Sequence, residues 1–524
     1  MAVKVGKRLD IVQNMSVSSR WFCVHGHFYQ PPRENPWTGA VERQLSAGDD
    51  HDWNVRIARE CYGPNGRARI VNDRNETLRV VNNYARISFN FGPTLLSWLE
   101  RERPDDYAKL LEADADSVRR LDGHGNAIAQ AFNHVILPLA EPADQVTQIR
   151  WGLADFAHRF GRKAEAMWLP ECACDDRVLR LLIEHGMKYA ILAPSQARRA
   201  RPIGARAWND VSGGGIDTRQ AYRWWSGAAG RSPHLDLFFY DGALSQAVAF
   251  GRLMADAGRA AEQLARRFSD EPPAPELVSL CTDGETYGHH EKFADMGLAY
   301  LLHEAAPAHG LQPVNFGWYL SRVSPTWEAQ IKPGPQGLGT AWSCAHGVAR
   351  WCSDCPCGAE NGGHTRWRRP LREALDWLRR RLANVFEGEG AALLKGPWEA
   401  RNDYVSLLLD PSPANEEAFW RRHLKSSASG RAGDARRLLE MQKFGMYMFT
   451  SCAWFFADVS GLEAVQNLKY AARAIELAAQ ATGRDLEPQF LDLLEQAPSN
   501  DPAFGTAAGV YRNRVKVKLK SGTP

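Results

Sequence analysis

Residues 277–291 read LVSLCTDGETYGHHE, an apolar run followed directly by acidic residues and histidines. Six earlier apolar runs are separated from one another by stretches with helical character. They cover residues 21–24, 87–91, 127–131, 164–169, 189–192 and 237–240. Strands that alternate with helices are typical of a parallel α/β sheet or barrel. Because such barrels place their chemistry at the carboxyl ends of the strands, we expect the functional site where these runs end.

The charge balance argues against a nucleic acid or a membrane surface as the partner. The 524 residues include 64 basic and 61 acidic ones, which gives a net charge of +3, so no strong field marks the surface. We therefore expect a neutral substrate. The 18 tryptophans and 14 tyrosines favour a carbohydrate, since flat aromatic faces stack on sugar rings, although most such rings are core residues in any protein.

The ten cysteines do not form the pattern of a secreted disulfide framework, which indicates a reducing compartment. The first twenty residues lack the apolar segment of a signal peptide, and no run of about 18 apolar residues follows. These features predict a cytoplasmic protein. They leave its oligomeric state open.

Two carboxylates that follow apolar runs are the candidate catalytic pair. Glu171 lies in AEAMWLPECACD (164–175), where Pro170 ends the run, and Asp283 follows the run at 277–281. Retaining glycoside hydrolysis needs two carboxyl groups about 5–5.5 Å apart, one as nucleophile and one as acid and base. The alternative is that both acids cap the helices that follow them.

Four segments favour a catalytic role for these two acids over helix capping. They read FCVHGHFYQPP (22–32), HVILPL (134–139), MWLPE (167–171) and TDGETYGHH (282–290). In this order they resemble the signatures of glycoside hydrolase family 57, which contains α-amylases, 4-α-glucanotransferases, branching enzymes and amylopullulanases. The resemblance implies an α/β fold, a distorted TIM-like (β/α)7 barrel followed by a C-terminal helical domain. It also implies that Glu171 is the nucleophile, that Asp283 is the general acid/base, and that no cofactor takes part.

The same resemblance, together with the aromatic residues near the motifs, suggests which residues contact the sugar. The expected substrate-binding residues are His25, His27, His134, Trp168, Glu285, His289, Trp342, Trp351, Asp354 and Trp454. The family often has a glutamate in its second signature, whereas residues 122–134 read DGHGNAIAQAFNH, with Gln130 or Asn133 as the candidate replacement. A buried core position is the alternative for the histidines and for Trp454. For His289 the alternative is a solvated loop.

A cysteine-rich loop at residues 342–367 reads WSCAHGVARWCSDCPCGAENGGHTRW. Cys352 and Cys355 have the C-x2-C spacing of a zinc site, and Cys357 or His364 would complete the ligand set. No second C-x2-C pair is present. The alternative is a reduced loop that faces the substrate through Trp342, His346, Trp351 and Asp354.

The apolar pattern changes near residue 370, where Leu371, Leu375, Leu378, Leu382 and Val385 repeat as on one helix face. Further helices are expected at 434–450 and 462–481, after a polar linker at 425–433. The tail at 510–524 alternates apolar and basic residues, as in an unpaired strand or the start of another domain. The expected organisation is a flexible segment (1–20), the catalytic barrel (21–335), the substrate-facing loop (336–370), a helical domain (371–500) and a basic tail (501–524).

Three functions are compatible with these residues. The first is amylase-like cleavage of α-1,4-glucosidic bonds in an α-glucan or maltooligosaccharide by a retaining mechanism, with a 4-α-glucanotransferase or branching enzyme as its alternative on the same carboxylates. The second is a metal-dependent mannosidase or polysaccharide deacetylase in which His25, His27 and an acid bind the metal. The third is a catalytically silent glucan-binding protein. Linkage and chain-length preference are not readable from the sequence.

Overall fold

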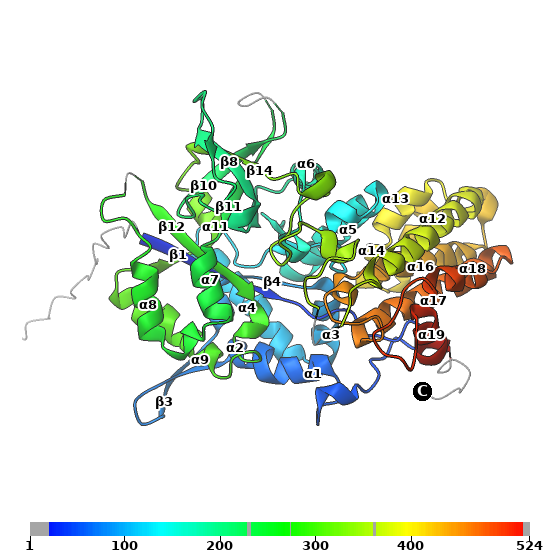
Figure 1. Ribbon diagram of the computed structural model, residues 1–524, viewed down its shortest axis with the longest axis horizontal. Coiled ribbons are helices and arrows are strands. Elements are labelled where there is room, and N and C mark those ends of the chain that lie inside the picture. The colour runs from blue at the N-terminus through cyan, green and yellow to red at the C-terminus, as the bar shows by residue number, and fades with distance from the viewer. Residues whose placement is uncertain (1–19, 228–231, 273, 360–362, 517–524) are drawn as a thin grey trace, which may run out of the picture.

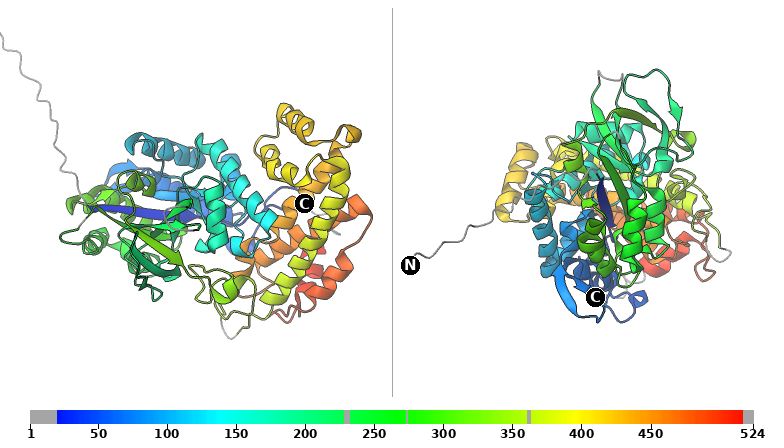
Figure 2. Two further views of the ribbon diagram at one scale, coloured as in Figure 1. Left: turned by 90° about the horizontal axis from the view of Figure 1, so that it is seen from above. Right: turned by 90° about the vertical axis from the view of Figure 1, so that its left-hand side faces the viewer.

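The computed structural model describes residues 20–227, 232–272, 274–359 and 363–516. The expected flexible segment, apart from residue 20, and the last eight residues of the basic tail lie outside these ranges. Figure 1 shows strands at the centre of one half of the molecule, with helices α12 and α16–α19 gathered at the other end. Figure 2 shows the same separation from above.

Parallel strands form the centre of the first half. Their bounds are β1 (Arg20–Phe28), β4 (Ser88–Phe91), β5 (Ala129–Gln130), β6 (Met167–Trp168), β7 (Tyr189–Leu192), β11 (His234–Phe239) and β12 (Glu276–Asp283). Strand β1 is buried along almost its whole length and pairs in parallel with β12 on one side and β4 on the other, while the short β13 (Gln312–Pro313) adds to the same sheet. These strands lie in the apolar runs, as expected for strands covered on both faces.

The strands continue around the core through weaker links. Single bridges join Phe89 to Ala127 and Ala166 to Tyr189, and β5 pairs in parallel with β6. Strand β11 pairs with β7 on one edge and with the antiparallel β10 on the other. It is thereby drawn into a second sheet of order β7-β11-β10-β14-β8-β9. The partners there are β8 (Ala197–Pro202), β9 (Asn209–Asp210), β10 (Ala221–Trp225) and β14 (Trp327–Ile331).

No strand ladder joins β11 to β12 within the described ranges. The α/β fold is therefore confirmed, whereas the closed seven-stranded barrel is not. The physical reason is that β11 uses its second edge for β10, and that β5 and β6 are only two residues long.

Helices connect and cover these strands. Their bounds are α3 (Pro93–Glu102), α4 (Pro104–Arg120), α5 (Pro142–Phe160), α6 (Asp176–Glu184), α7 (Gly242–Ala249), α8 (Ala257–Ala265) and α9 (Ala294–Tyr300). A separate hairpin of β2 (Ala68–Val71) and β3 (Thr77–Val81) extends from the surface. Asp175 is the N-cap residue of helix α6, and its side chain accepts a hydrogen bond from the backbone N–H of Val178.

The second half is helical, as the sequence pattern predicts. The main helices are α12 (Arg368–Leu393), α13 (Pro397–Asp403), α15 (Pro413–His423), α16 (Ala432–Tyr447), α17 (Leu462–Thr482), α18 (Glu487–Leu494) and α19 (Ala507–Val510). Leu371, Leu375, Leu378 and Leu382 are all buried along α12, and Phe386 instead of Val385 completes the buried face. A second hydrophobic core, distinct from the core around the strands, lies between these helices.

The described part of the tail is not a strand. A helical segment, Tyr511–Lys516, continues directly from α19. Val510, Tyr511 and Val515 are buried, and this spacing places them on one helical face although the letters alternate with basic residues. No helix among the described residues combines the length and the apolar character that a membrane crossing requires.

Candidate active site

Glu171 follows β6 in a short 3-10 turn, Pro170–Cys172, with left-handed backbone angles (φ 59°, ψ 21°). Such angles cost energy for a residue other than glycine and are found preferentially at functional sites. Its carboxylate Oε2 accepts hydrogen bonds from Trp342 Nε1 (3.1 Å) and from Ser343 Oγ. The Trp342 backbone N–H also donates to the Glu171 carbonyl (2.9 Å). The loop after Thr340 therefore orients both the backbone and the side chain of Glu171.

The pKa of Glu171 reflects opposing influences. Burial raises it above its ordinary value, while the hydrogen bonds from Ser343 and Trp342 and the positive charge of Arg350 lower it. Neither Ser343 nor Arg350 was among the expected site residues. Both stabilise the ionised form of Glu171, which is the form a nucleophile requires.

Asp283 is the last residue of β12, where it is paired in register with His27 of β1. Its side chain is exposed to solvent, yet surrounding protein and the negative charge of Glu171 together raise its pKa to about 7. The charge of Glu171 contributes to this increase, which indicates that the two carboxylates lie near each other.

Glu285 lies behind Asp283 in the interior. Its Oε1 accepts hydrogen bonds from the Tyr29 backbone N–H (3.0 Å) and the Tyr62 hydroxyl (2.6 Å). Burial raises its pKa to about 8, against the hydrogen bond from Tyr62 and with a further increase from the charge of Asp283. Glu285 is only 5% exposed. Its position therefore favours a supporting role in the interior over direct contact with a sugar.

Three of the expected histidines form one hydrogen-bonded chain at the carboxyl ends of β1 and β4. His25 Nδ1 lies 2.9 Å from Ser88 Oγ, and its Nε2 lies 3.1 Å from Asn90 Oδ1. The Asn90 amide lies 2.9 Å from His27 Nδ1. His27 Nε2 in turn lies 3.1 Å from His134 Nε2, and His134 Nδ1 contacts Ser451 Oγ at 2.6 Å.

All three rings are neutral. Burial lowers the pKa of His25 and of His27 to about 3, and it lowers that of His134 well below the ordinary value. With one proton on each ring the chain has two possible directions, and the shorter contact of His27 Nδ1 with the Asn90 amide (2.9 Å) than with Asn90 Oδ1 (3.3 Å) favours one of them. The Asn90 amide donates to His27 Nδ1, His27 Nε2–H donates to His134, and His134 Nδ1–H donates to Ser451 Oγ. The chain is thus fully ordered from the strands to the helical half.

Trp168 connects this chain to the carboxylates. Its ring stacks on His25 and His27 at centroid distances of 4.7 and 5.1 Å and meets Trp342 edge to face at 5.2 Å. Its indole Nε1 and the Gln130 Nε2 are buried without a hydrogen-bond partner among the described atoms. Buried donors of this kind are costly unless a ligand or water accepts from them. Gln130, the candidate replacement for the family's glutamate, also accepts from Asn90 Nδ2 (2.7 Å).

Four expected sugar contacts lie elsewhere. Trp351 and Trp454 are each 1% exposed, and their indole nitrogens donate to the carbonyl oxygens of Ser451 and Arg368. A ring enclosed in this way is not available to stack on a sugar, so the geometry supports neither expectation. The burial of Trp454 favours its core alternative.

Asp354 and His289 are also separate from the carboxylates. The Asp354 carboxylate lies 3.7 Å from Arg369 at the surface. His289 Nδ1 bonds the Glu60 carboxylate, and the His289 ring meets Trp53 edge to face. Neither residue has an interaction with Glu171 or Asp283 in the part of the chain that the structure describes. The expectation that they bind substrate therefore finds no support in the geometry.

The cysteine-rich loop brings together a different set of potential metal ligands from the expected one. Cys352 Sγ faces the Val348 carbonyl. The His364 backbone N–H donates to Asn500 Oδ1, and its carbonyl accepts from Asn500 Nδ2. Cys355 and Cys357 instead meet Cys344 and His346. The loop folds so that its C-x-C and C-x-H pairs converge, and the C-x2-C spacing is misleading because it ignores this turn.

Two carboxylates at the carboxyl ends of parallel strands are typical of the sites of glycoside hydrolases. Residues 71–306, less than half of the chain, match the model of glycosyl hydrolase family 57. Residues 364–521 match a second model, a domain of unknown function named DUF3536.

Curated relatives are similar over a short stretch. An alpha-amylase 1 of Dictyoglomus thermophilum and a 4-alpha-glucanotransferase of Thermococcus litoralis are each 27% identical over 107 residues, or 20% of this chain. The chain covers 15% of the length of each of these relatives.

Solved structures share the fold over almost the whole chain. An exo-type maltose-forming amylase of Pyrococcus sp. ST04 superposes with a TM-score of 0.67 at 14% identity, covering 97% of this chain and 93% of that protein. A branching enzyme of glycoside hydrolase family 57 from Pyrococcus horikoshii gives a TM-score of 0.54 at 13% identity, with 96% of each chain covered.

Proposed function

We propose that this protein is a retaining enzyme that cleaves or transfers α-glucosidic bonds of a glucan, with Glu171 as nucleophile and Asp283 as general acid/base. The observation that carries the proposal is the different hydrogen bonding of the two carboxylates. Burial raises the pKa of both acids, but Glu171 accepts hydrogen bonds from Trp342 and Ser343 that counteract the increase, whereas the charge of Glu171 adds to the increase at Asp283, whose pKa is raised to about 7. Surroundings that favour the ionised form of one acid and the protonated form of the other suit this chemistry.

The proposed reaction proceeds in two steps. Asp283 donates its proton to the glycosidic oxygen while the Glu171 carboxylate attacks the anomeric carbon, which forms a glycosyl ester and releases the leaving sugar. The ester carries no charge, so the contribution of the Glu171 charge to the raised pKa of Asp283 disappears, while that of burial remains. Asp283 can then stay ionised and accept the proton of the incoming water or sugar hydroxyl.

Water as acceptor gives hydrolysis, and a sugar hydroxyl gives transfer. Relatives named alpha-amylase and 4-alpha-glucanotransferase are each 27% identical over 107 residues. Amylase-like hydrolysis of α-1,4 bonds is the proposed reaction, with glucanotransferase or branching activity as the second candidate. The proposed sugar contact is Trp342, the partly exposed ring that donates to the Glu171 carboxylate. His27 and Trp168, which are 4% and 1% exposed, meet the Trp342 ring edge to face and support it from the interior.

A metal-dependent mannosidase or deacetylase is less well supported, because it needs histidine nitrogens free to bind the metal. Both ring nitrogens of His25 and of His27 contact Ser88, Asn90 or His134. In the proposed site these two rings are held by hydrogen bonds and pack against Trp168.

We further propose that the expected unit of residues 21–335 works as a broken (β/α)7 barrel, with the loop of 336–370 completing the site. The support is one backbone hydrogen bond, from the Asp241 N–H to the Ser279 carbonyl (2.7 Å), at the place where β11 and β12 would have to pair. The same loop supplies Trp342 and Ser343 to Glu171.

The test is product analysis on amylose, glycogen and a single purified maltooligosaccharide. Shorter products alone support hydrolysis, and longer oligomers support transfer. The absence of any product from all three substrates, with a correctly folded protein, overturns the proposal.

A second arm tests the nucleophile. Glu171→Ala with azide and an activated α-glucoside should yield the β-glucosyl azide, since azide enters from the face that Glu171 vacates. An α-glucosyl azide would contradict the assignment.

A further inference from the structure

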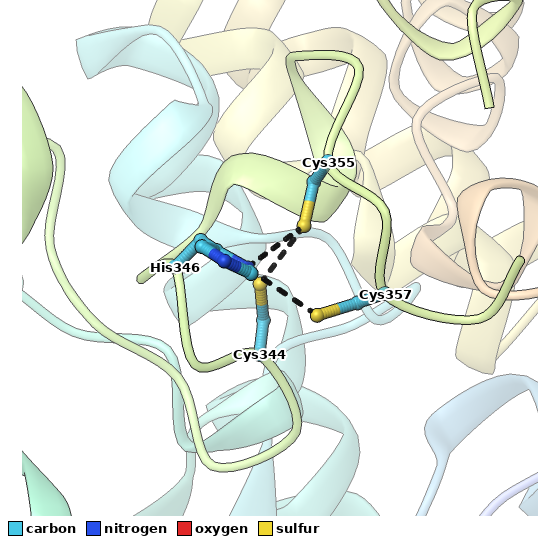
Figure 3. A group of neighbouring side chains, drawn as sticks. All are labelled: Cys344, His346, Cys355 and Cys357. Carbon is cyan, nitrogen blue, oxygen red and sulfur yellow. Dashed lines mark hydrogen bonds between the residues drawn. The ribbon is translucent and has the colours of Figure 1, made fainter.

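Four potential metal ligands converge in the loop that follows Glu171's hydrogen-bond partners. Cys344, His346, Cys355 and Cys357 place one donor atom each within 4.8 Å of all the others. Figure 3 shows the three sulfur atoms and the imidazole directed at a common point from the two arms of one loop. Two of the thiols, those of Cys344 and Cys355, are buried.

The separations between the donors match a tetrahedral zinc site. Zn–S bonds of about 2.3 Å and a Zn–N bond of about 2.0–2.1 Å imply S···S edges of roughly 3.8 Å and N···S edges of roughly 3.6 Å. The Cys344 and Cys355 sulfurs are 3.7 Å apart. His346 Nδ1 lies 3.3 Å from Cys355 Sγ and 3.4 Å from Cys357 Sγ.

A disulfide or a purely hydrogen-bonded cluster fits these contacts less well. A disulfide requires an S–S bond of about 2.05 Å, far shorter than the 3.7 Å between Cys344 and Cys355. Hydrogen bonding alone would have two thiols directed at one nitrogen of His346, and a thiol is a weak donor. A single cation accounts for all four donors at once.

We propose that Cys344, His346, Cys355 and Cys357 bind one structural Zn²⁺ through three thiolates and His346 Nδ1. Four protein ligands leave no open position for water, so the ion is structural and takes no part in glycoside cleavage. The proposal goes beyond the proposed function and does not depend on it.

The surrounding contacts support a fixed ligand geometry. The buried Arg368 at the start of α12 donates through Nη1 to the carbonyl oxygens of Cys355 and Cys357, both at 2.7 Å. This holds the C-x-C arm against the helical half. Contacts outside the ligand set that orient the ligands are typical of metal sites.

The site also has a consequence for Glu171. Cys344 directly follows Ser343, which donates to the Glu171 carboxylate together with Trp342. Zinc would close the loop from Cys344 to Cys357 and thereby fix the position of both donors. Without it, the loop would be held by fewer contacts.

The metal content of the full-length protein tests the proposal. The chain is produced in zinc-supplemented medium, purified with reductant and analysed by elemental mass spectrometry, with about one zinc per chain expected. Cys344→Ser and Cys357→Ser should lower the zinc content severalfold. Cys352→Ser and His364→Ala, which change the same residue types in the same loop outside the cluster, should retain it.

Wild-type protein without stoichiometric zinc overturns the proposal, as does equal loss of zinc in the control variants. Should the serine variants fail to fold, wild-type protein stripped with a chelator and loaded with Co²⁺ gives an independent answer. Tetrahedral thiolate ligation produces strong visible d–d absorption and sulfur-to-cobalt charge transfer, and a spectrum without them overturns the assignment. So does a Cys344–Cys355 disulfide in the protein purified under reductant. None of these measurements depends on glucan cleavage.

Discussion

Glu171 and Asp283 occupy comparable places, at the carboxyl ends of β6 and β12, but their surroundings differ. Glu171 receives donors from a loop about 170 residues away in the sequence, and Arg350 adds a positive charge. Asp283 has only burial and the charge of Glu171 acting on its pKa. The difference indicates that the loop carrying Trp342 and Ser343, more than the strands, favours the ionised form of Glu171.

The largest expected effect concerns Glu171. Glu171→Gln should reduce turnover by about 10⁴-fold or more, because the glycosyl ester can no longer form. The measurement is the steady-state rate on amylose, with the melting temperature as the control for folding. Undiminished turnover in a folded variant would contradict the assignment of Glu171 as the nucleophile.

Asp283→Asn should reduce turnover by about 10²–10⁴-fold, the range that proton transfer contributes. The loss should be greatest for a maltooligosaccharide, whose leaving sugar needs the proton, and smaller for an α-glucoside with an acidic phenol. Equal losses on both substrates would argue against the acid role.

The same residue predicts the alkaline limit of the wild-type enzyme. Since Asp283 must be protonated to donate, kcat/KM should fall as the pH rises through about 7. The two apparent pKa values of the profile belong to the coupled pair. A profile that is flat from pH 6 to 9 would contradict this prediction.

A smaller effect is expected from Ser343→Ala. Loss of a hydrogen bond that favours the ionised form should raise the pKa of Glu171. The acidic limb of the pH profile should therefore move to higher pH, with a rate loss of about tenfold. Ser353→Ala is the matched control, since Ser353 Oγ bonds only the Ala349 carbonyl of the same loop. Identical profiles for the two variants would show that Ser343 has no influence on Glu171.

The smallest effect concerns stability. The pKa of Asp283 is raised on folding, so the folded state holds its proton more tightly than the unfolded chain. The stability from this proton is fully present below the ordinary pKa of 3.8 and is lost as the pH rises to about 7. Asp283→Asn should therefore melt at a higher temperature relative to wild type at pH 8 than at pH 4. Calorimetric scans at both values measure this, and a difference of opposite sign would contradict it.

The strands and the carboxylate pair could be predicted because both depend on local sequence. Apolar runs locate strands such as β1 and β12, and the motifs around Glu171 and Asp283 identify the acids. The closed barrel could not be predicted reliably, since the edge partner of β11 is chosen by tertiary structure. Helix α12 shows the same limit on a smaller scale, because Phe386 replaces Val385 on its buried face.

Long-range contacts account for the remaining errors. Ser343 reaches Glu171 only because the loop folds back, and no local pattern marks it. Trp351 and Trp454 are of the residue type that stacks on sugars, but both are buried like core residues. The C-x2-C spacing favours Cys352 and His364 over Cys344 and His346, because spacing along the chain does not show which pairs the turns bring together.

The chain of neutral rings from His25 to Ser451 spans both halves of the molecule. Ser451 lies in the segment Ser451–Trp454 of the helical half and accepts the last proton of that chain. If the helices moved away, His134 would lose its acceptor, and each tautomer back to Asn90 would be free to invert. The helical half therefore influences, through Ser451, the direction of the hydrogen bonds among the histidines beneath the proposed site.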